Sequence, residues 1–113
     1  NPRLRYIEET EIQSSAGGLA VDEALALSVA AGGSPALRLY SYRPCVIVGR
    51  FQNLGDAVDL DACRRHGHEW NRRHTGGGAV IMGPDQVAVA LAAPDERGRF
   101  IGSVRGHFQR FAA

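Results

Sequence analysis

The sequence predicts an α+β fold in which strands outnumber helices and some neighbouring strands are linked as hairpins. Three observations support this prediction. One Ala- and Leu-rich stretch has the composition of a helix, several short runs have the apolar pattern of strands, and Gly or Pro separates these segments. No repeat and no linker divides the 113 residues, so we expect a single domain over residues 1–113.

Four elements are expected in the first half: a strand over 3–9, a helix over 19–31, and strands over 36–42 and 45–48. Asp22 and Glu23 would lie in the first turn of the helix, where carboxylates interact favourably with the helix dipole. Gly32 and Gly33 supply its C-terminal stop. The second strand alternates, whereas the third is apolar at every position, which is typical of a strand buried on both faces.

Five elements are expected in the second half: a helix over 59–66, an extended segment over 68–73, strands over 79–82 and 86–93, and a helix from Ser103. Asp59 suits the N-cap of the first helix and Gly67 suits its end. In the last strand Val87, Val89 and Leu91 share one face, as in a half-buried strand.

Composition excludes several classes of function. The net charge is only +1 and no stretch approaches the ~20 apolar residues of a membrane span, so neither nucleic acid nor a membrane is expected as a partner. With two cysteines and no secretion signal, a cytoplasmic, reduced protein is expected. All 13 basic residues are Arg, so these residues supply no lysine to any mechanism. A start without Met and a stop inside the last expected helix predict a truncated domain.

The segment from Asn71 to Val80 carries the clearest chemical signal. Gly76, Gly77 and Gly78 lack Cβ atoms, so the backbone can approach a ligand closely and its N–H groups can converge on an anion. Arg72 and Arg73 precede them and can bind phosphate or carboxylate. On a strand they point to opposite faces, so only one is expected to reach the ligand. The spacing matches neither a P-loop nor a dinucleotide fingerprint, and a glycine-rich turn beside solvated arginines stays an alternative.

A second polar segment, Gly49 to Asn53 (Gly-Arg-Phe-Gln-Asn), follows the apolar strand over 45–48. Loops at strand ends commonly carry ligand sites. By itself this segment also fits an ordinary exit from a strand. Its value comes from its combination with the glycine-rich segment.

Together these segments resemble the lipoate–protein ligase A family, within the superfamily of biotin/lipoate ligases and octanoyltransferases. The similar stretches, in order, are Leu19–Leu25, Leu37–Pro44, Gly49–Asn53, Val58-Asp59 with Cys63 and Gly67, and Arg72-Arg73-His74-Thr75-Gly76-Gly77-Gly78-Ala79-Val80. The resemblance covers residues 17 to 94. It implies a class II synthetase-like mixed sheet with flanking helices, here truncated.

The resemblance also implies a two-step reaction. Lipoate and ATP, with magnesium, would form lipoyl-AMP, and the acyl group would pass to a lysine of a carrier domain. The carriers would be lipoyl-accepting domains of 2-oxoacid dehydrogenases or the carrier protein of glycine cleavage. Positioning and charge stabilisation, which Arg side chains and backbone N–H groups supply, are what adenylation requires.

Residue roles follow from the same resemblance. Arg73 would contact nucleotide phosphate, and Gly76 and Gly77 would let the loop close over the intermediate. Backbone groups would hold the nucleotide at Gly78, Ala79, Val80 and Ile81. A substrate pocket would include Arg72, Thr75, Gly49, Arg50, Phe51, Gln52 and Asn53.

The chain departs from the family at two points. Met82 stands where the family usually has His. The family's catalytic lysine is absent and is expected beyond Ala113, so this fragment is expected to be inactive alone.

Several alternatives remain open. A lipoyl or octanoyl transferase would act through a downstream cysteine without ATP, and a non-catalytic partner subunit would keep the fold only. His66, His68 and His74 suggest a metal site weakly, since the neighbouring arginines repel cations. Cys45, Cys63 and Trp70 are interpreted as packed residues, and no metal is expected.

Overall fold

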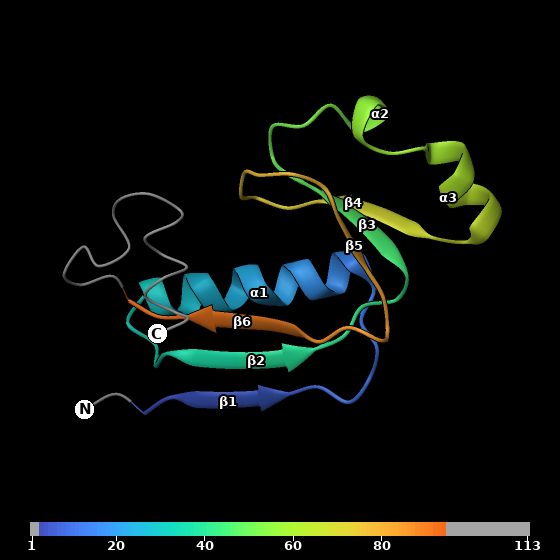
Figure 1. The fold of residues 1–113 in the computed structure, drawn as a ribbon. Helices are drawn as coiled ribbons and strands as arrows, with labels where there is room; N and C mark the ends of the chain where they lie inside the picture. The colour runs from blue at the N-terminus through green and yellow to red at the C-terminus, as the bar shows by residue number, and fades with distance from the viewer. Residues whose placement is uncertain (1–2, 95–113) are drawn as a thin grey trace, which may run out of the picture.

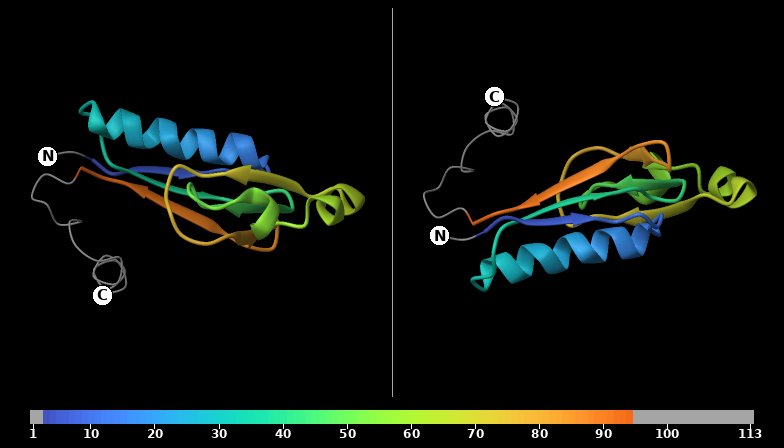
Figure 2. Two further views of the ribbon diagram at one scale, coloured as in Figure 1. Left: turned by 90° about the horizontal axis from the view of Figure 1, so that it is seen from above. Right: turned by 90° about the horizontal axis from the view of Figure 1, so that it is seen from below.

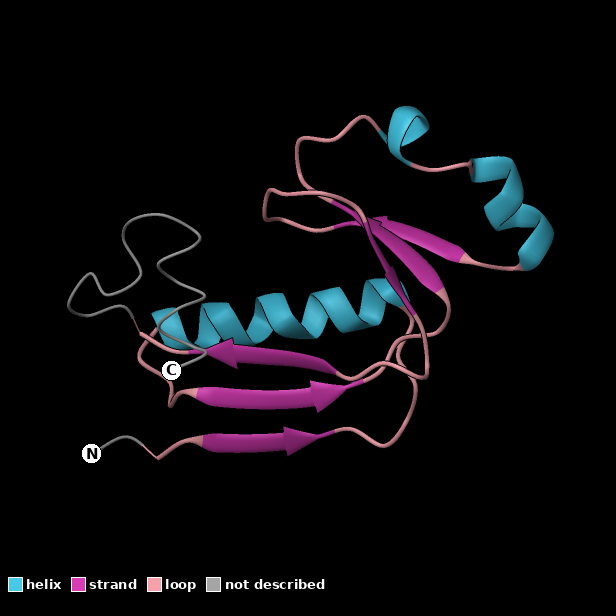
Figure 3. Cartoon of the chain, in the orientation of Figure 1, coloured by secondary structure: helices cyan, strands magenta, loops and turns pink. Residues whose placement is uncertain are grey.

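The computed structural model describes residues 3–94 and shows an α+β fold built from two mixed sheets with helices packed against them (Figures 1 and 3). The elements, in chain order, are β1 (Arg5–Glu8), α1 (Ser15–Ala30), β2 (Ala36–Tyr40), β3 (Cys45–Val48), α2 (Leu54–Ala57), α3 (Leu60–His66), β4 (Glu69–Arg72), β5 (Val80–Met82) and β6 (Ala88–Ala92). None of the helices in this range is long and apolar enough to cross a membrane.

Both sheets have the same plan. In each, a parallel pair is joined through helical segments and an antiparallel strand completes the sheet, in the orders β1-β2-β6 and β4-β3-β5. The expected hairpins are therefore wrong within the described residues, because β5 pairs with β3 and β6 pairs with β2 rather than with sequence neighbours. Parallel pairing of β3 and β4 places the carboxyl ends of both strands at one edge.

Helix α1 begins four residues earlier than expected. Ser14 caps it, since its hydroxyl accepts a hydrogen bond from Gly17 N at 2.9 Å. Gly18 lies inside the helix, where it packs so closely on Tyr42 that a Cβ would come within 2.2 Å of the ring. Only glycine therefore fits at this position. Asp22 therefore lies beyond the first turn. Close packing on Tyr42 outweighs the low helix propensity of the two glycines.

The second half agrees with most expectations. Helix α3 is capped by Asp59 and ends at Gly67, which has the left-handed φ of 68°. Helix α2 was missed because it is a single turn, capped by Asn53. The helix expected from Ser103 lies outside the described residues.

Strand β6 alternates as predicted, with its small residues turned toward the core. Ala88 and Ala90 pack on buried residues, whereas Val87, Val89 and Leu91 are each about half or more exposed. The apolar face of this strand is therefore not covered by residues 3–94.

Helix α1 covers one face of the first sheet and reaches the second sheet with its N-terminus (Figure 2). There the Glu69 carboxylate of β4 accepts a hydrogen bond from Ser15 N at 2.7 Å. A cluster of Tyr40, Tyr42, Cys45 and Ile47 packs between the sheets. A second cluster of Val48, Val58 and Cys63 lies under α2 and α3.

The most buried charge is Arg38 of β2, whose side chain has no exposed surface. Its guanidinium binds Glu9 at 2.9 and 3.0 Å, Asp22 of α1 at 2.8 Å and the Gly18 carbonyl at 2.9 Å. It also lies 3.6 Å above the centre of the Tyr40 ring. A buried charge persists only when it is paired and hydrogen-bonded, and here four of the five N–H donors of Arg38 have acceptors.

Arg38→Ala should lower the free energy of unfolding by about 3–5 kcal/mol, because Glu9 and Asp22 lose their buried counter-charge. Arg64→Ala is the matched control, since Arg64 forms an exposed pair with Asp61 at 3.1 Å and such pairs contribute at most about 1 kcal/mol. Urea unfolding of both variants measures the difference, and equal losses would contradict a structural role for Arg38.

Candidate functional site

The two segments singled out from the sequence lie side by side. Val48 pairs with Arg72 in the parallel register of β3 and β4, so the 49–53 turn and the glycine-rich loop leave from the same edge of the sheet (Figure 1). Arg50 N donates to Thr75 O at 2.9 Å, and Arg73 N donates to Val48 O at 3.0 Å. The tertiary structure therefore joins the two motifs into one site.

The closest approach between them is at Gly49. A Cβ on Gly49 would lie 2.2 Å from the Gly77 carbonyl oxygen. Gly77 itself has φ of 98°, a conformation that side chains with a Cβ rarely adopt. By contrast, a Cβ on Gly78 would meet nothing within 4 Å. Gly77 is therefore the position of this loop whose backbone conformation favours glycine.

Arg72 organises the 49–53 turn. Its Nη1 donates to the carbonyl oxygens of Gly49 at 2.9 Å, Arg50 at 3.1 Å and Gln52 at 2.6 Å. A guanidinium has a fixed fork of donors, so three converging carbonyls hold the turn in one shape. Arg72 therefore has a structural role in this conformation.

Arg73 instead reaches its own loop. Its Nη2 donates to the carbonyls of Gly76 at 2.7 Å and Gly78 at 2.8 Å, and its Nη1 donates to Ile47 O at 3.3 Å. The two arginines thus bind different segments, Arg72 the 49–53 turn and Arg73 the glycine-rich loop. Three of the five N–H donors of Arg73 have these partners.

The 49–53 turn presents only part of its chemistry to solvent. The Gln52 side chain accepts from Gly49 N at 2.8 Å, and the Asn53 side chain caps α2. Arg50 is exposed, and Phe51 is 83% exposed. Gln52 and Asn53 shape the turn, while Arg50 and Phe51 form its outer surface.

Helix α1 holds the glycine-rich loop from the other side. His74 Nε2 lies 2.6 Å from a Glu23 carboxylate oxygen, across 51 residues of sequence, and both side chains are exposed. From the sequence, His74 is part of the motif from Arg72 to Val80 and a weak metal candidate, and neither interpretation predicts its contact with Glu23. Within residues 3–94, no group of three or more His, Cys, Asp or Glu side chains could hold a metal ion.

A buried polar network next to α1 was also missed. Tyr40 donates a hydrogen bond to Asp22, and the Tyr40 and Tyr42 hydroxyls lie 2.9 Å apart. Burial, and then the hydrogen bond to Asp22, raise the pKa of Tyr40, and burial raises that of Tyr42. Burial lowers the pKa of Arg38, but bonds to Glu9 and Asp22 outweigh it, so the net change is upward. The sequence feature that could have predicted this network is Arg38. On a strand it shares a face with Ala36 and Tyr40, which places a charged residue on the buried face.

The sequence matches the lipoyl protein ligase A/B catalytic domain over residues 15–113. The chain belongs to this family. It is 34% identical over 106 residues to octanoyltransferase LipM of Moorella thermoacetica, an alignment that covers 92% of this chain and 38% of that protein.

Two solved structures agree with this assignment. The bi-partite lipoate protein ligase of Thermoplasma acidophilum, described with its E2 lipoyl domain, superposes with a TM-score of 0.68 at 33% identity, over 80% of this chain and 36% of that one. Lipoate-protein ligase A bound with ATP superposes with a TM-score of 0.72 at 30% identity, over 96% and 41%. The chain therefore spans about two fifths or less of these relatives.

Met82 has a packing role in this structure. It lies on β5 opposite Cys45 and packs against the cluster of Tyr40, Tyr42, Cys45 and Ile47. An apolar side chain at this position completes the core between the sheets. Burial raises the pKa of the adjacent Cys45 thiol to about 11, which agrees with a packed cysteine.

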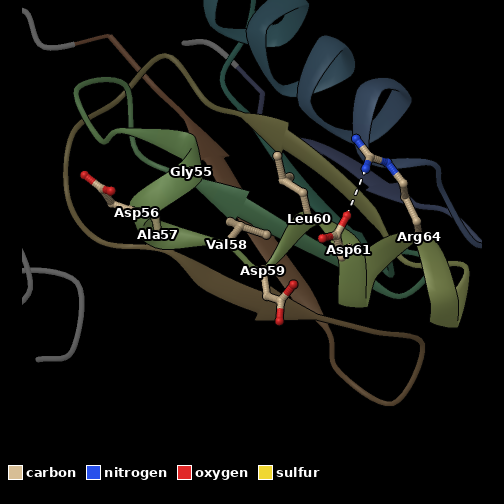
Figure 4. Close-up of a pocket in the computed structure, with 8 residues that line it drawn as sticks. All are labelled: Gly55, Asp56, Ala57, Val58, Asp59, Leu60, Asp61 and Arg64. Carbon is tan, nitrogen blue, oxygen red and sulfur yellow. Dashed lines mark hydrogen bonds and ion pairs between the residues drawn. The ribbon is translucent and has the colours of Figure 1, made fainter.

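The depression on α2 and α3 is a poor candidate for the site (Figure 4). It has a volume of about 580 Å³ and is lined by Gly55, Asp56, Ala57, Val58, Asp59, Leu60, Asp61 and Arg64. Asp59 already caps α3, and Asp61 is paired with Arg64. Its lining includes no residue of the glycine-rich loop or the 49–53 turn.

Gly49→Ala should displace the glycine-rich loop, because its methyl group would collide with Gly77 O. We expect a lower melting temperature and weaker ligand binding by the full-length protein. Gly78→Ala is the control for stability, since its methyl group meets open space and should change the free energy of unfolding by no more than about 0.5 kcal/mol. Thermal unfolding of both variants measures the effect of the contact, ligand titration compares Gly49→Ala with the unmodified protein, and variants of equal stability would contradict the contact.

The raised pKa of Cys45 predicts a loss of stability in alkali. Burial raises the pKa of the Cys45 thiol from its ordinary value of 9.0 to about 11 in the folded chain. Its contribution is therefore complete below pH 9 and declines above it, by at most about 1.4 kcal/mol per pH unit. Cys45→Ala should show a shallower decline between pH 9 and 10, measured by urea unfolding, and parallel curves would refute this.

Proposed function

We propose that the full-length protein attaches a lipoyl-type acyl group to a lysine of a carrier domain through an acyl-adenylate formed from ATP. The supporting observation is the junction of Arg73, the glycine-rich loop and the 49–53 turn at one edge of the second sheet. Membership of the lipoyl protein ligase A/B family supports the acyl chemistry.

Arg73 is the proposed phosphate ligand. In the described conformation its Nη2 is bound to two uncharged carbonyls, those of Gly76 and Gly78. A phosphate oxygen makes a stronger, charge-assisted hydrogen bond, so phosphate binding would displace them. The loop would then be free to turn its N–H groups toward the anion.

The backbone of Ala79, Val80 and Ile81 is proposed to hold the nucleotide together with Gly78. Among the strands of residues 3–94, β5 lies at the edge of its sheet and pairs only with β3. One row of its N–H and C=O groups is therefore left for another partner. Residues 74 to 81 are all exposed, so a ligand can reach this edge and Thr75.

The catalytic lysine and the magnesium ion of the proposed reaction are not assigned to any described residue. No lysine occurs in the 113 residues, so the catalytic lysine is predicted to lie beyond them. Magnesium stays a prediction as well. The described residues hold no cluster of three or more potential ligands, and no step is assigned to the ion.

The second candidate is an octanoyl transferase, favoured by the similarity to LipM of Moorella thermoacetica. Such an enzyme would need no ATP and would form an acyl-enzyme on a cysteine. Cys45 and Cys63 are both buried and are unsuited to that role. For either candidate, the carrier would be a lipoyl-accepting domain, as in the bi-partite ligase described with its E2 lipoyl domain.

Arg73→Ala in the full-length protein should reduce acyl-adenylate formation by about 10²–10³-fold, because transition-state charge loses its partner. Arg72→Ala is the comparison. It should lower the melting temperature, because the 49–53 turn loses its three hydrogen bonds to Arg72, and it should reduce acyl-adenylate formation less than Arg73→Ala does. Pyrophosphate release and thermal unfolding measure the two effects. Equal, mild losses of activity would remove Arg73 from the site, and acyl transfer without ATP would select the transferase.

A further inference from the structure

The tip of the 49–53 turn has a feature that acyl activation alone does not explain. Phe51 is 83% exposed, more than any other large apolar side chain in residues 3–94. The Arg50 guanidinium lies 5.3 Å from the centre of its ring. A phenyl ring and a guanidinium are thus presented together to solvent.

The turn that carries them is held firmly. Arg72 binds three of its carbonyls, Gln52 closes it through Gly49 N, and Arg50 N is bonded to Thr75 O. Ordering an interface residue costs free energy at binding, and a turn fixed in advance avoids most of that cost. The aromatic side chain is therefore displayed from a preorganised base.

The shape of the tip favours a protein partner over a small ligand. Small molecules bind in concave pockets that surround them. A ring with 83% of its surface exposed projects outward, as aromatic and Arg residues do when they anchor a protein interface by entering a pocket of the partner. This differs from the substrate-pocket role expected for Phe51 from the sequence.

The tip lies beside the glycine-rich loop, and this position favours the carrier domain as its partner. A Cβ on Gly76 would lie 4.0 Å from the Phe51 ring, so the ring borders the glycine-rich loop. A protein bound there would lie beside the proposed acyl-adenylate, where the acceptor lysine must arrive. The exposed guanidinium of Arg50 would pair with a carboxylate of that protein.

We propose that Arg50 and Phe51 form a docking point for the carrier domain, with Phe51 entering a shallow apolar depression near the acceptor lysine and Arg50 contacting an acidic residue beside it. This inference rests on the proposed function. Its chemistry is the same whether the acyl donor is an adenylate or an acyl-enzyme.

The test uses the full-length protein and an E2 lipoyl domain whose acceptor lysine is unmodified. Phe51→Ala should raise the Kd for that domain by about tenfold or more in a calorimetric titration. Arg50→Ala should weaken binding at low salt and reduce its salt dependence. Leu27→Ala, which removes another exposed apolar side chain on α1, is the control and should leave the Kd unchanged.

Steady-state kinetics separate docking from other roles. Phe51→Ala should raise KM for the lipoyl domain and leave KM for the acyl substrate unchanged. A higher KM for the acyl substrate instead would place Phe51 in the acyl pocket and overturn the proposal. An unchanged Kd would also overturn it. Absence of acyl transfer by the unmodified protein would refute the proposed function, while the titration would still decide whether the tip binds the domain.

Discussion

The buried guanidinium of Arg38 is the interaction on which the arrangement of this chain depends. It joins the segment after β1, the middle of α1 and the strand β2 through Glu9, Asp22 and the Gly18 carbonyl. Because an unpaired buried charge is costly, every one of these partners must be in place at once. The helix is thereby fixed in rotation and in position along the sheet.

The position of α1 determines the surroundings of the site. With Asp22 turned toward Arg38, the next residue, Glu23, meets His74 of the glycine-rich loop. At the N-terminus of the helix, Ser15 N binds Glu69 of β4. One helix therefore connects the buried network of the first sheet to the loop and strand that carry the site on the second.

Arginine side chains also shape the site itself, through backbone carbonyls rather than carboxylates. Arg72 holds the 49–53 turn and Arg73 holds the glycine-rich loop. These contacts are replaceable, since a neutral carbonyl is a weaker acceptor than a phosphate oxygen. Under the proposed function, the guanidinium of Arg73 would keep the loop ordered before phosphate binds and would then exchange its carbonyl partners for phosphate oxygens.

The sequence alone determined the local features of the protein. The strand Cys45–Val48 and the helix Leu60–His66 with its Asp59 and Gly67 caps depend on interactions within a few residues, so composition and spacing predict them. Family membership was likewise readable, because the motif residues keep their order and spacing. The loop pair at the candidate site was predicted as two motifs that act together.

Only the tertiary structure decided which residues meet across the fold. The start of α1 at Ser15 depends on the packing of Gly18 against Tyr42. The division into two sheets depends on the pairing of β5 with β3 and of β6 with β2, which are distant in sequence. Three further features are equally non-local: the Arg38 network, the binding of different loops by Arg72 and Arg73, and the exposure of Phe51. Each arises from contacts between residues far apart in sequence, whose free energies exceed the local preferences that a sequence pattern can express.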